Sequence, residues 1–298
     1  MWDRVERLIG KENLTLLAQK RVGVVGLGSG GGFVAQSLAM SGVSHFVLID
    51  DDTLEATNIV RHVADRRYLG QPKAEVVADL IRQRNPQATI STRVGRIEQH
   101  MDALDDLDLL IVGVDGEQVK YIINEACLER DLVAIYAGVY ERGEGGDVVV
   151  IYPYDGPCYA CWSAAVREEV QLTNEVGELD YGMIGPEGTL EAEPALWLHV
   201  VRVALTQTDF ALKFLLKETD QYSPLPTNTV ILANTAIEII AGEVTPPHSA
   251  LWVQIDRDPH CLVCGDQMQA NMTDSQTIHA VSLQDLADET GISVESDT

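Results

Sequence analysis

Residues 21–52, RVGVVGLGSGGGFVAQSLAMSGVSHFVLIDDD, decide the fold class of this 298-residue chain. A short apolar run at residues 22–25 leads into three glycines, Gly26, Gly28 and Gly31, which have the spacing G-x-G-x-x-G. Apolar residues at helical spacing follow the glycines. Glycine permits a tight turn, and it lets backbone N–H groups approach a phosphate at the positive end of a helix. The stretch therefore predicts a strand, a phosphate-binding loop and a helix. The alternative is a glycine turn that serves only close packing.

A second apolar run, residues 46–49, ends at Asp50, about twenty residues beyond the glycines. Nucleotide-binding strand–helix–strand units carry an acidic residue at this position, where its carboxylate accepts hydrogen bonds from a ribose. Because strand, glycine loop, helix, strand and acid occur in this order, we expect the unit to bind a nucleotide. The kind of nucleotide must be inferred from the rest of the chain.

Strands and helices alternate in the remainder of the N-terminal half. The patterns predict strands at residues 88–93, 107–112 and 133–137, a helix that begins near Lys73 and another at residues 119–130. Such alternation implies a Rossmann-like α/β fold, with a mostly parallel sheet and helices on both faces. Ligands of these sheets bind beyond the carboxyl ends of the strands. Since Gly28, Asp50 and Asp115 all fall at that edge, we expect three segments to converge on one site.

The C-terminal half has a different pattern, which predicts antiparallel strands that extend the sheet. The expected elements are strands at residues 147–152, 229–233 and 250–255, a helix at residues 194–216 and a long polar crossing loop at residues 167–192. We expect a single domain over residues 1–265, followed by an acidic tail at residues 266–298. The domain is expected to consist of an N-terminal helix (residues 1–20), a nucleotide-binding half (residues 21–140) and a second half (residues 141–265).

The composition excludes some classes of partner. The chain carries 46 acidic and 21 basic residues, a formal net charge of -25. Such a surface repels a phosphate backbone, so nucleic acid is an unlikely partner. No apolar run of about 18 residues occurs, and the first residues lack the apolar core of a signal peptide. We therefore expect a cytoplasmic protein without a membrane partner, and its acidity would suit a salt-adapted organism.

Four of the five cysteines form two C-x-x-C pairs, Cys158 with Cys161 and Cys261 with Cys264. In a cytoplasmic chain such pairs indicate metal or redox chemistry before structural disulfides. Four thiolates make a closed, structural zinc site, which would tie the end of the chain to its middle. Two redox sites or buried free thiols are the alternatives. The remaining Cys127 lies on the apolar side of a predicted helix, where a structural thiol is expected.

Charged and polar residues gather near the predicted ligand edge. The stretch DDDTLEATNIVRHV is too polar for a strand, and it contains Asp52, Asn58 and Arg61. Lys73 falls in the first turn of a helix, where a positive charge is unfavourable with the helix dipole. An anion nearby would explain this lysine, although an ordinary surface lysine remains the alternative. Arg7, in the N-terminal helix, would ordinarily be a solvated charge.

Taken in order, GLGSGGG, LIDDDTLEATNIVRH, GQPK, VGVD and the paired C-x-x-C motifs resemble the MoeB/ThiF/HesA-type adenylyltransferases, relatives of ubiquitin-activating enzymes. The resemblance covers residues 4–265. It implies ATP-dependent activation of the C-terminal glycine of a small ubiquitin-like or sulfur-carrier protein that ends in Gly-Gly. In that reaction the carboxylate attacks the α-phosphorus of ATP, pyrophosphate leaves, and an acyl-adenylate remains.

The resemblance also implies a role for each polar candidate. Asp50 matches the ribose-binding acid, and Asp52 joins it and the glycines in the nucleotide site. The phosphate-contacting set corresponds to Asn58, Arg61 and Lys73, the acid that holds Mg²⁺ to Asp115, and the arginine that reaches across a homodimer into the partner's ATP site to Arg7. The second half, residues 141–265, would receive the carrier and hold the zinc.

Two departures from the family pattern refine this expectation. Gly116 follows Asp115 where the family often has asparagine, which removes one polar contact. No cysteine lies in residues 167–192, so no thioester cysteine is evident and an adenylation-only, MoeB-like enzyme is favoured.

Three other functions were weighed against adenylation. An NAD-dependent oxidoreductase would leave Arg61, Lys73 and Asp115 without a role. A non-catalytic partner subunit would not need to retain these residues. A family branch that cyclises a tRNA nucleoside is disfavoured by the net charge of -25.

Overall fold

A computed structural model describes residues 1–169, 195–220, 223–240 and 243–266 of the chain. The chain divides into two compact units, Met1–Arg257 and Asp258–Thr298. The first unit contains the sheet, its covering helices and the predicted ligand edge. The tail predicted at residues 266–298 lies outside the described residues after its first residue.

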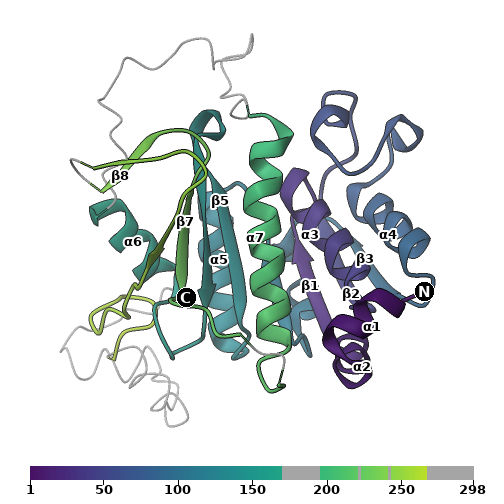
Figure 1. Cartoon of the computed structure of the whole chain (residues 1–298), viewed down its shortest axis with the longest axis horizontal. Coiled ribbons are helices and arrows are strands. Elements are labelled where there is room, and N and C mark those ends of the chain that lie inside the picture. The colour runs from purple at the N-terminus through teal and green to yellow at the C-terminus, as the bar shows by residue number, and fades with distance from the viewer. Residues whose placement is uncertain (170–194, 221–222, 241–242, 267–298) are drawn as a thin grey trace, which may run out of the picture. The chain divides into compact units, whose positions relative to one another are not determined.

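The first unit is built on an eight-stranded sheet with the order β10-β7-β6-β5-β4-β1-β2-β3 (Figure 1). Its strands are β1 (Arg21–Val25), β2 (His45–Asp50), β3 (Thr89–Val94), β4 (Leu109–Val112), β5 (Ala134–Val139), β6 (Gly145–Ile151), β7 (Thr229–Ala233) and β10 (Ala250–Val253). The pairs from β3 to β5 are parallel, and the pairs from β5 to β10 are antiparallel. The predicted α/β class, with antiparallel strands added C-terminally, is confirmed.

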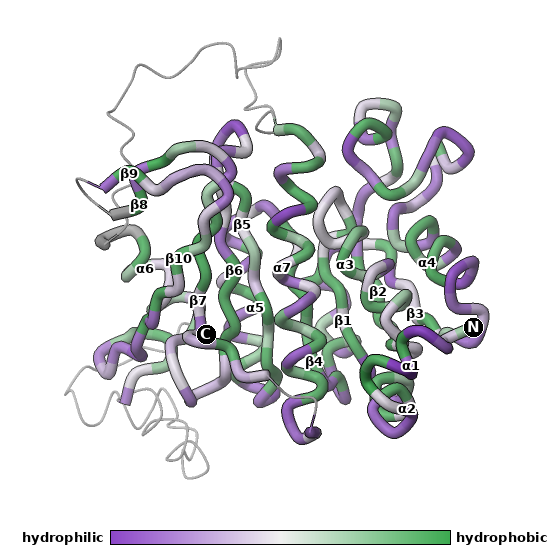
Figure 2. The backbone as a smooth tube through the Cα atoms, in the orientation of Figure 1, coloured by the Kyte–Doolittle hydropathy of each residue, from purple (hydrophilic) through white to green (hydrophobic). Residues whose placement is uncertain are grey.

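Helices cover both faces of this sheet. One face packs against α3 (Ser29–Met40), α4 (Lys73–Arg84) and α7 (Trp197–Leu215), and the other against α5 (Glu117–Glu129) and α6 (Tyr159–Glu169). Because side chains alternate along a strand, each strand supplies both layers. In β1, Val22 and Val24 face the first layer and Val25 faces the second. The central strands are accordingly largely apolar (Figure 2), whereas the edge strand β3, with the sequence TISTRV, is more polar. No helix in the described part of the chain is long and apolar enough to cross a membrane.

The N-terminal segment differs from the single helix predicted within residues 1–20. Two helices, α1 (Asp3–Ile9) and α2 (Lys11–Gln19), meet at Gly10, where φ is 85°. A glycine adopts this left-handed conformation without a steric penalty, and the helix is interrupted there. Helix α2 buries Leu17, whereas α1 buries no residue.

Besides short 3₁₀ turns, one helix and two strands of the described chain were not predicted from the sequence. Helix α6 begins inside the first C-x-x-C motif, and β8 (Ile237–Ile240) pairs with β9 (Glu243–Thr245) in a separate two-stranded sheet. The crossing loop predicted at residues 167–192 lies outside the described residues from residue 170 onward, and its first three residues belong to α6.

The position of a ligand site follows from the strand order. Strand β1 lies between β2 and β4, so the chain continues to opposite sides of β1 in its two halves. A crevice forms where the order reverses, beyond the carboxyl ends of the strands. The loops after β1, β2 and β4 meet at this point.

Close backbone contact makes glycine necessary in two of these loops. A Cβ on Gly31 would lie 1.9 Å from the carbonyl oxygen of Gly26, and a Cβ on Gly113 would lie 2.7 Å from the same atom. Gly26 itself has φ of 82°. The first turn of α3 can therefore approach both β1 and the end of β4 only because side chains are absent.

This packing predicts that alanine is tolerated at one of two neighbouring glycines and not at the other. Gly31→Ala should lower the free energy of unfolding by about 3 kcal/mol or more, because its methyl group meets rigid backbone. Gly30→Ala is the matched control, since its Cβ would meet Val200 and Ala204 at 3.8 and 4.0 Å, which is ordinary contact. Urea unfolding of the two variants measures the difference. Equal unfolding midpoints would contradict the proposed close approach.

Candidate functional site

A cleft of about 320 Å³ lies beyond the carboxyl ends of β1, β2 and β4. Its wall is made by four short segments and two helix starts: Val25, Gly26, Gly28, Ile49, Asp50, Asp51, Asp52, Lys73, Gly95, Arg96, Ile97, Glu98, Gly113, Val114, Asp115, Gly116 and Val119. The three segments expected to converge do so here. The additional segment, residues 95–98, follows β3 and was not expected from the sequence.

The glycine loop is held through both peptide groups of the buried Leu27. Its N–H donates to Asp50 Oδ2 at 2.5 Å, and its carbonyl oxygen lies 2.9 Å from His62 Nε2. His62 Nδ1 accepts the N–H of Ala64 at 3.0 Å, so Nε2 carries the proton and donates to Leu27. Burial lowers the pKa of His62, which favours this neutral form. The loop is therefore fixed before any ligand binds.

Asp50 is more than an exposed acceptor at the end of a strand. Its second oxygen, Oδ1, accepts the N–H of Asp52 at 2.9 Å, so both carboxylate oxygens hold backbone amides. Burial raises the pKa of Asp50, and the amides of Leu27 and Asp52 oppose this effect. The side chain thus joins the loop after β1 to the segment after β2.

Lys73 lies at the start of α4, with only 10% of its side chain exposed, and it lines the cleft. Its Nζ donates to Asp52 Oδ2 at 2.7 Å, and its backbone N–H donates to the Asp52 carbonyl at 2.9 Å. A lysine in the first turn of a helix is explained by a nearby anion, and the Asp52 carboxylate is such an anion. A buried ammonium at the cleft wall also suits an anionic ligand.

Asp115 lies in the loop between β4 and α5 and is exposed at the cleft wall. Within the described part of the chain, no hydrogen bond or ion pair involves its carboxylate. Its position is consequently set by the backbone that leads into the loop, where the N–H of Gly113 donates to the Val25 carbonyl at 2.8 Å.

The structure brings together six of the predicted residues: Gly26, Gly28, Asp50, Asp52, Lys73 and Asp115 line the cleft. Gly31 lies beneath the loop as a packing residue. Arg61 is the last residue of a short 3₁₀ turn, Ile59–Arg61, and Asn58 directly precedes this turn. Neither residue lines the cleft. Asn58 Oδ1 accepts the N–H of Glu55 at 3.0 Å. The exposed Arg7 pairs with Asp3 at 3.1 Å on α1 and does not line the cleft.

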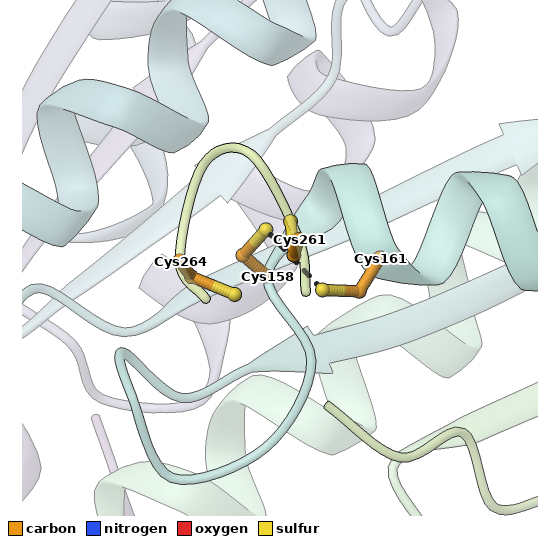
Figure 3. Close-up of side chains that lie close together, drawn as sticks. All are labelled: Cys158, Cys161, Cys261 and Cys264. Carbon is orange, nitrogen blue, oxygen red and sulfur yellow. Dashed lines mark hydrogen bonds between the residues drawn. The ribbon is translucent and has the colours of Figure 1, made fainter. Parts of the chain in front are cut away.

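The four paired cysteines form a compact cluster (Figure 3). Their sulfur atoms all lie within 4.8 Å of one another, and the sulfurs of Cys158 and Cys161 are 3.8 Å apart. None of these cysteines is in a disulfide. Four ligands at ~2.3 Å from a tetrahedral zinc lie about 3.8 Å from each other, so the donor set and its spacing fit zinc.

Comparison with known proteins places these observations in a family. The sequence model of the ThiF family matches residues 3–248. Adenylyltransferase and sulfurtransferase UBA4 from Yarrowia lipolytica is 32% identical over 183 residues, which are 59% of this chain and 46% of that protein. The SAMP-activating enzyme E1 from Haloferax volcanii is 30% identical over 51% of this chain and 57% of its own length. The chain thus spans about half the length of these two relatives.

Molybdopterin-synthase adenylyltransferase from Salmonella typhimurium is 32% identical over 192 residues, 63% of this chain and 76% of that enzyme. Among solved structures, MccB from E. coli has a TM-score of 0.65 at 22% identity, over 85% of this chain and 69% of MccB. One of the MccB structures contains ATP. At this identity the structural similarity shows a shared fold.

A buried cluster of ionisable groups, none of which lines the cleft, was missed in the sequence. Asp147 in β6 pairs with Gly138 near the end of β5, at the same edge of the sheet. Burial raises its pKa to about 7, although the Lys120 ammonium acts to lower it. Lys120 Nζ lies 2.9 Å from Glu117 Oε1, which also accepts the Tyr159 hydroxyl at 3.1 Å. The acid in the otherwise apolar GGDVVVI strand was the available sequence signal.

This buried acid predicts a characteristic dependence of stability on pH. The folded chain keeps the Asp147 proton up to about pH 7, whereas an unfolded aspartate loses it near 3.8. Unfolding between these values releases a proton, so the contribution of Asp147 to stability is lost as the pH rises. Relative to wild type, Asp147→Asn should gain up to about 3 kcal/mol of unfolding free energy between about pH 5 and about pH 8.

Urea unfolding at both pH values measures this gain. Asp102→Asn is the control, because Asp102 is an exposed aspartate outside the cluster. The same pH dependence in both variants would show that Asp147 does not hold a proton in the folded chain.

Proposed function

The chain belongs to the ThiF family, and from this membership we propose that it is an ATP-dependent adenylyltransferase. Its substrate would be the C-terminal glycine of a small ubiquitin-like or sulfur-carrier protein that ends in Gly-Gly. The observation that carries the proposal is one cleft that combines a fixed glycine loop, the buried Lys73 and the exposed Asp115. Relatives named adenylyltransferases and a SAMP-activating enzyme support the choice of reaction.

In the proposed reaction, a carboxylate oxygen of the carrier attacks the α-phosphorus of ATP. A new oxygen–phosphorus bond forms, the bond between the α-phosphorus and the oxygen that bridges it to the β-phosphate breaks, and pyrophosphate leaves with that oxygen. The product is a glycyl-adenylate at the carrier's C-terminus. Because two anions must meet, catalysis of such a displacement depends on positioning and on positive charge around the phosphates.

The residues of the cleft can supply these functions. Backbone N–H groups of the loop at Gly28 and the positive end of α3 would face the phosphates. The Lys73 ammonium would pair with phosphate oxygens beside Asp52. Asp50 would bind the ribose while it fixes the loop through Leu27. Arg61 lies outside the lining, so a phosphate contact requires its side chain to turn toward the cleft.

Asp115 fits a further requirement of ATP chemistry. Mg²⁺ prefers carboxylate and phosphate oxygens and would neutralise charge on the phosphates. Asp115 offers an exposed carboxylate at the cleft wall, in a loop where glycine follows it and leaves space. We assign Asp115 as the protein ligand of this ion.

Two further parts of the proposal concern assembly and the cysteines. Arg7 is exposed on α1, away from the cleft of its own chain, which suits a role in the ATP site of a partner in a homodimer. The cluster of Cys158, Cys161, Cys261 and Cys264 would bind one structural zinc. A site with four thiolates leaves no open position for catalysis. We expect the enzyme to act in the cytoplasm.

Substitution of the proposed Mg²⁺ ligand tests the function. Asp115→Asn should lower the rate of ATP–pyrophosphate exchange by about 100-fold or more, because the charge that holds the ion is lost. The assay is run with the small Gly-Gly-ended proteins encoded in the same genome. Asp131→Asn is the control: it removes an equal charge at an exposed turn with φ of 51°, which asparagine tolerates. Exchange by Asp115→Asn at the wild-type rate would refute the role.

The same variant tests the homodimer. Arg7→Ala and Asp115→Asn should each be inactive alone, but a re-equilibrated equimolar mixture should regain about a quarter of wild-type activity, because one site in each mixed dimer is intact. No recovery, with active monomers in solution, would exclude the arginine in trans.

Metal analysis tests the cysteine cluster. Native protein should contain about one zinc per chain, and Cys261→Ser combined with Cys264→Ser should lose it and unfold at a lower temperature. Cys127→Ser is the control, because this buried thiol is outside the cluster. Elemental analysis that finds metal-free native protein would contradict the proposal.

A further inference from the structure

A single polar side chain links α7 to the sheet beneath the cleft. Gln207 is 2% exposed, in a helix that otherwise contributes Val203, Phe210 and Ala211 to the apolar core. Its Nε2 donates to the carbonyl oxygen of Val112 at 3.1 Å and to that of Ile135 at 2.8 Å. A buried amide needs such partners, so these two bonds explain why a polar group can occupy the position.

The two carbonyls belong to the strands that lead to the cleft. Val112 is the last residue of β4, and Ile135 lies in the neighbouring strand β5. Asp115 follows Val112 by three residues. Since its carboxylate has no bond to another described residue, its place depends on how the end of β4 is held. On one side the Gly113 N–H binds Val25 of β1, and on the other Gln207 binds Val112.

Helix α7 also packs against α3, the helix that follows the glycine loop. Val200 and Ala204 pack beside Gly30, where a built Cβ would lie 3.8 and 4.0 Å from them. Gly30 lies in the first turn of α3, two residues after Gly28 of the cleft wall. One helix therefore contacts both α3, which follows the glycine loop, and the end of β4, which precedes Asp115.

We propose that Gln207 is a positioning residue that sets the distance between the Asp115 loop and the glycine loop by holding the end of β4 to α7. The proposal rests on the proposed function, in which both loops contact MgATP. Gln207 acts through Val112 and does not touch the ligand. Its loss would leave the fold but displace the carboxylate that holds Mg²⁺.

The test compares two substitutions that remove donors from adjacent buried residues of α7. Gln207→Met keeps length and apolar volume but cannot donate. Thr208→Val is the matched control, because Thr208 is 4% exposed and its Oγ1 donates only to Ala204 within the helix, at 2.8 Å. Calorimetric titration of full-length protein with ATP, with and without Mg²⁺, measures binding apart from activity. Urea unfolding reports stability.

Gln207→Met should weaken ATP binding in the presence of Mg²⁺ by about 10-fold or more, with little effect when Mg²⁺ is absent. Thr208→Val should bind as wild type. In the Asp115→Asn background, Gln207→Met should have no additional effect, since the group that it positions is gone. Three results would each overturn the proposal: additive losses in the double variant with Asp115→Asn, an equal loss in Gln207→Met and Thr208→Val, or unchanged binding by Gln207→Met. Failure of wild-type protein to bind ATP would instead refute the proposed function.

Discussion

The site depends on the two hydrogen bonds that hold the peptide groups of Leu27. Asp50 accepts the N–H of Leu27, and His62 donates to the Leu27 carbonyl. Two later segments of the chain therefore fix the loop that follows β1. Asp50 then binds Asp52, and Asp52 binds Lys73, which extends the connection to α4. A phosphate-binding loop that is already ordered loses little conformational entropy when the ligand arrives. Asp50 thus fixes the loop through this connected set, and in the proposed function the same residue also binds the ribose.

Local sequence pattern predicted much of this arrangement. The apolar runs of β1 and β2 and the intervening glycines determined the parallel sheet and its ligand edge, because their spacing reflects contacts made within a few tens of residues. The gathering of Gly28, Asp50 and Asp115 followed from the same topology and is seen in the cleft. The break at Gly10 was missed because glycine is tolerated inside a helical pattern, and only the fold shows where it has positive φ.

The features that escaped sequence reasoning are contacts between distant segments. His62 is one polar residue in a polar stretch, and its role appears only when Leu27 is brought beside it. Gln207 lies 95 residues from Val112, and no helical pattern indicates that its amide faces a strand end. Asp147 was visible as an acid in an apolar strand, but its neighbours Lys120 and Glu117 come from another element. Such pairs are determined by packing and are not encoded by spacing.

The two-helix N-terminus has a thermodynamic consequence. Helix α1 has seven residues, none of them buried, and Leu8 is 77% exposed. A helix of this length is marginal in water, and Gly10 separates it from the packed helix α2. The free energy that keeps α1 helical must therefore come largely from surfaces beyond its own segment. By mass action, the helical population of α1 is linked to the concentration and occupancy of any surface that it packs against, so in the proposed homodimer the order of the N-terminal arm would report assembly.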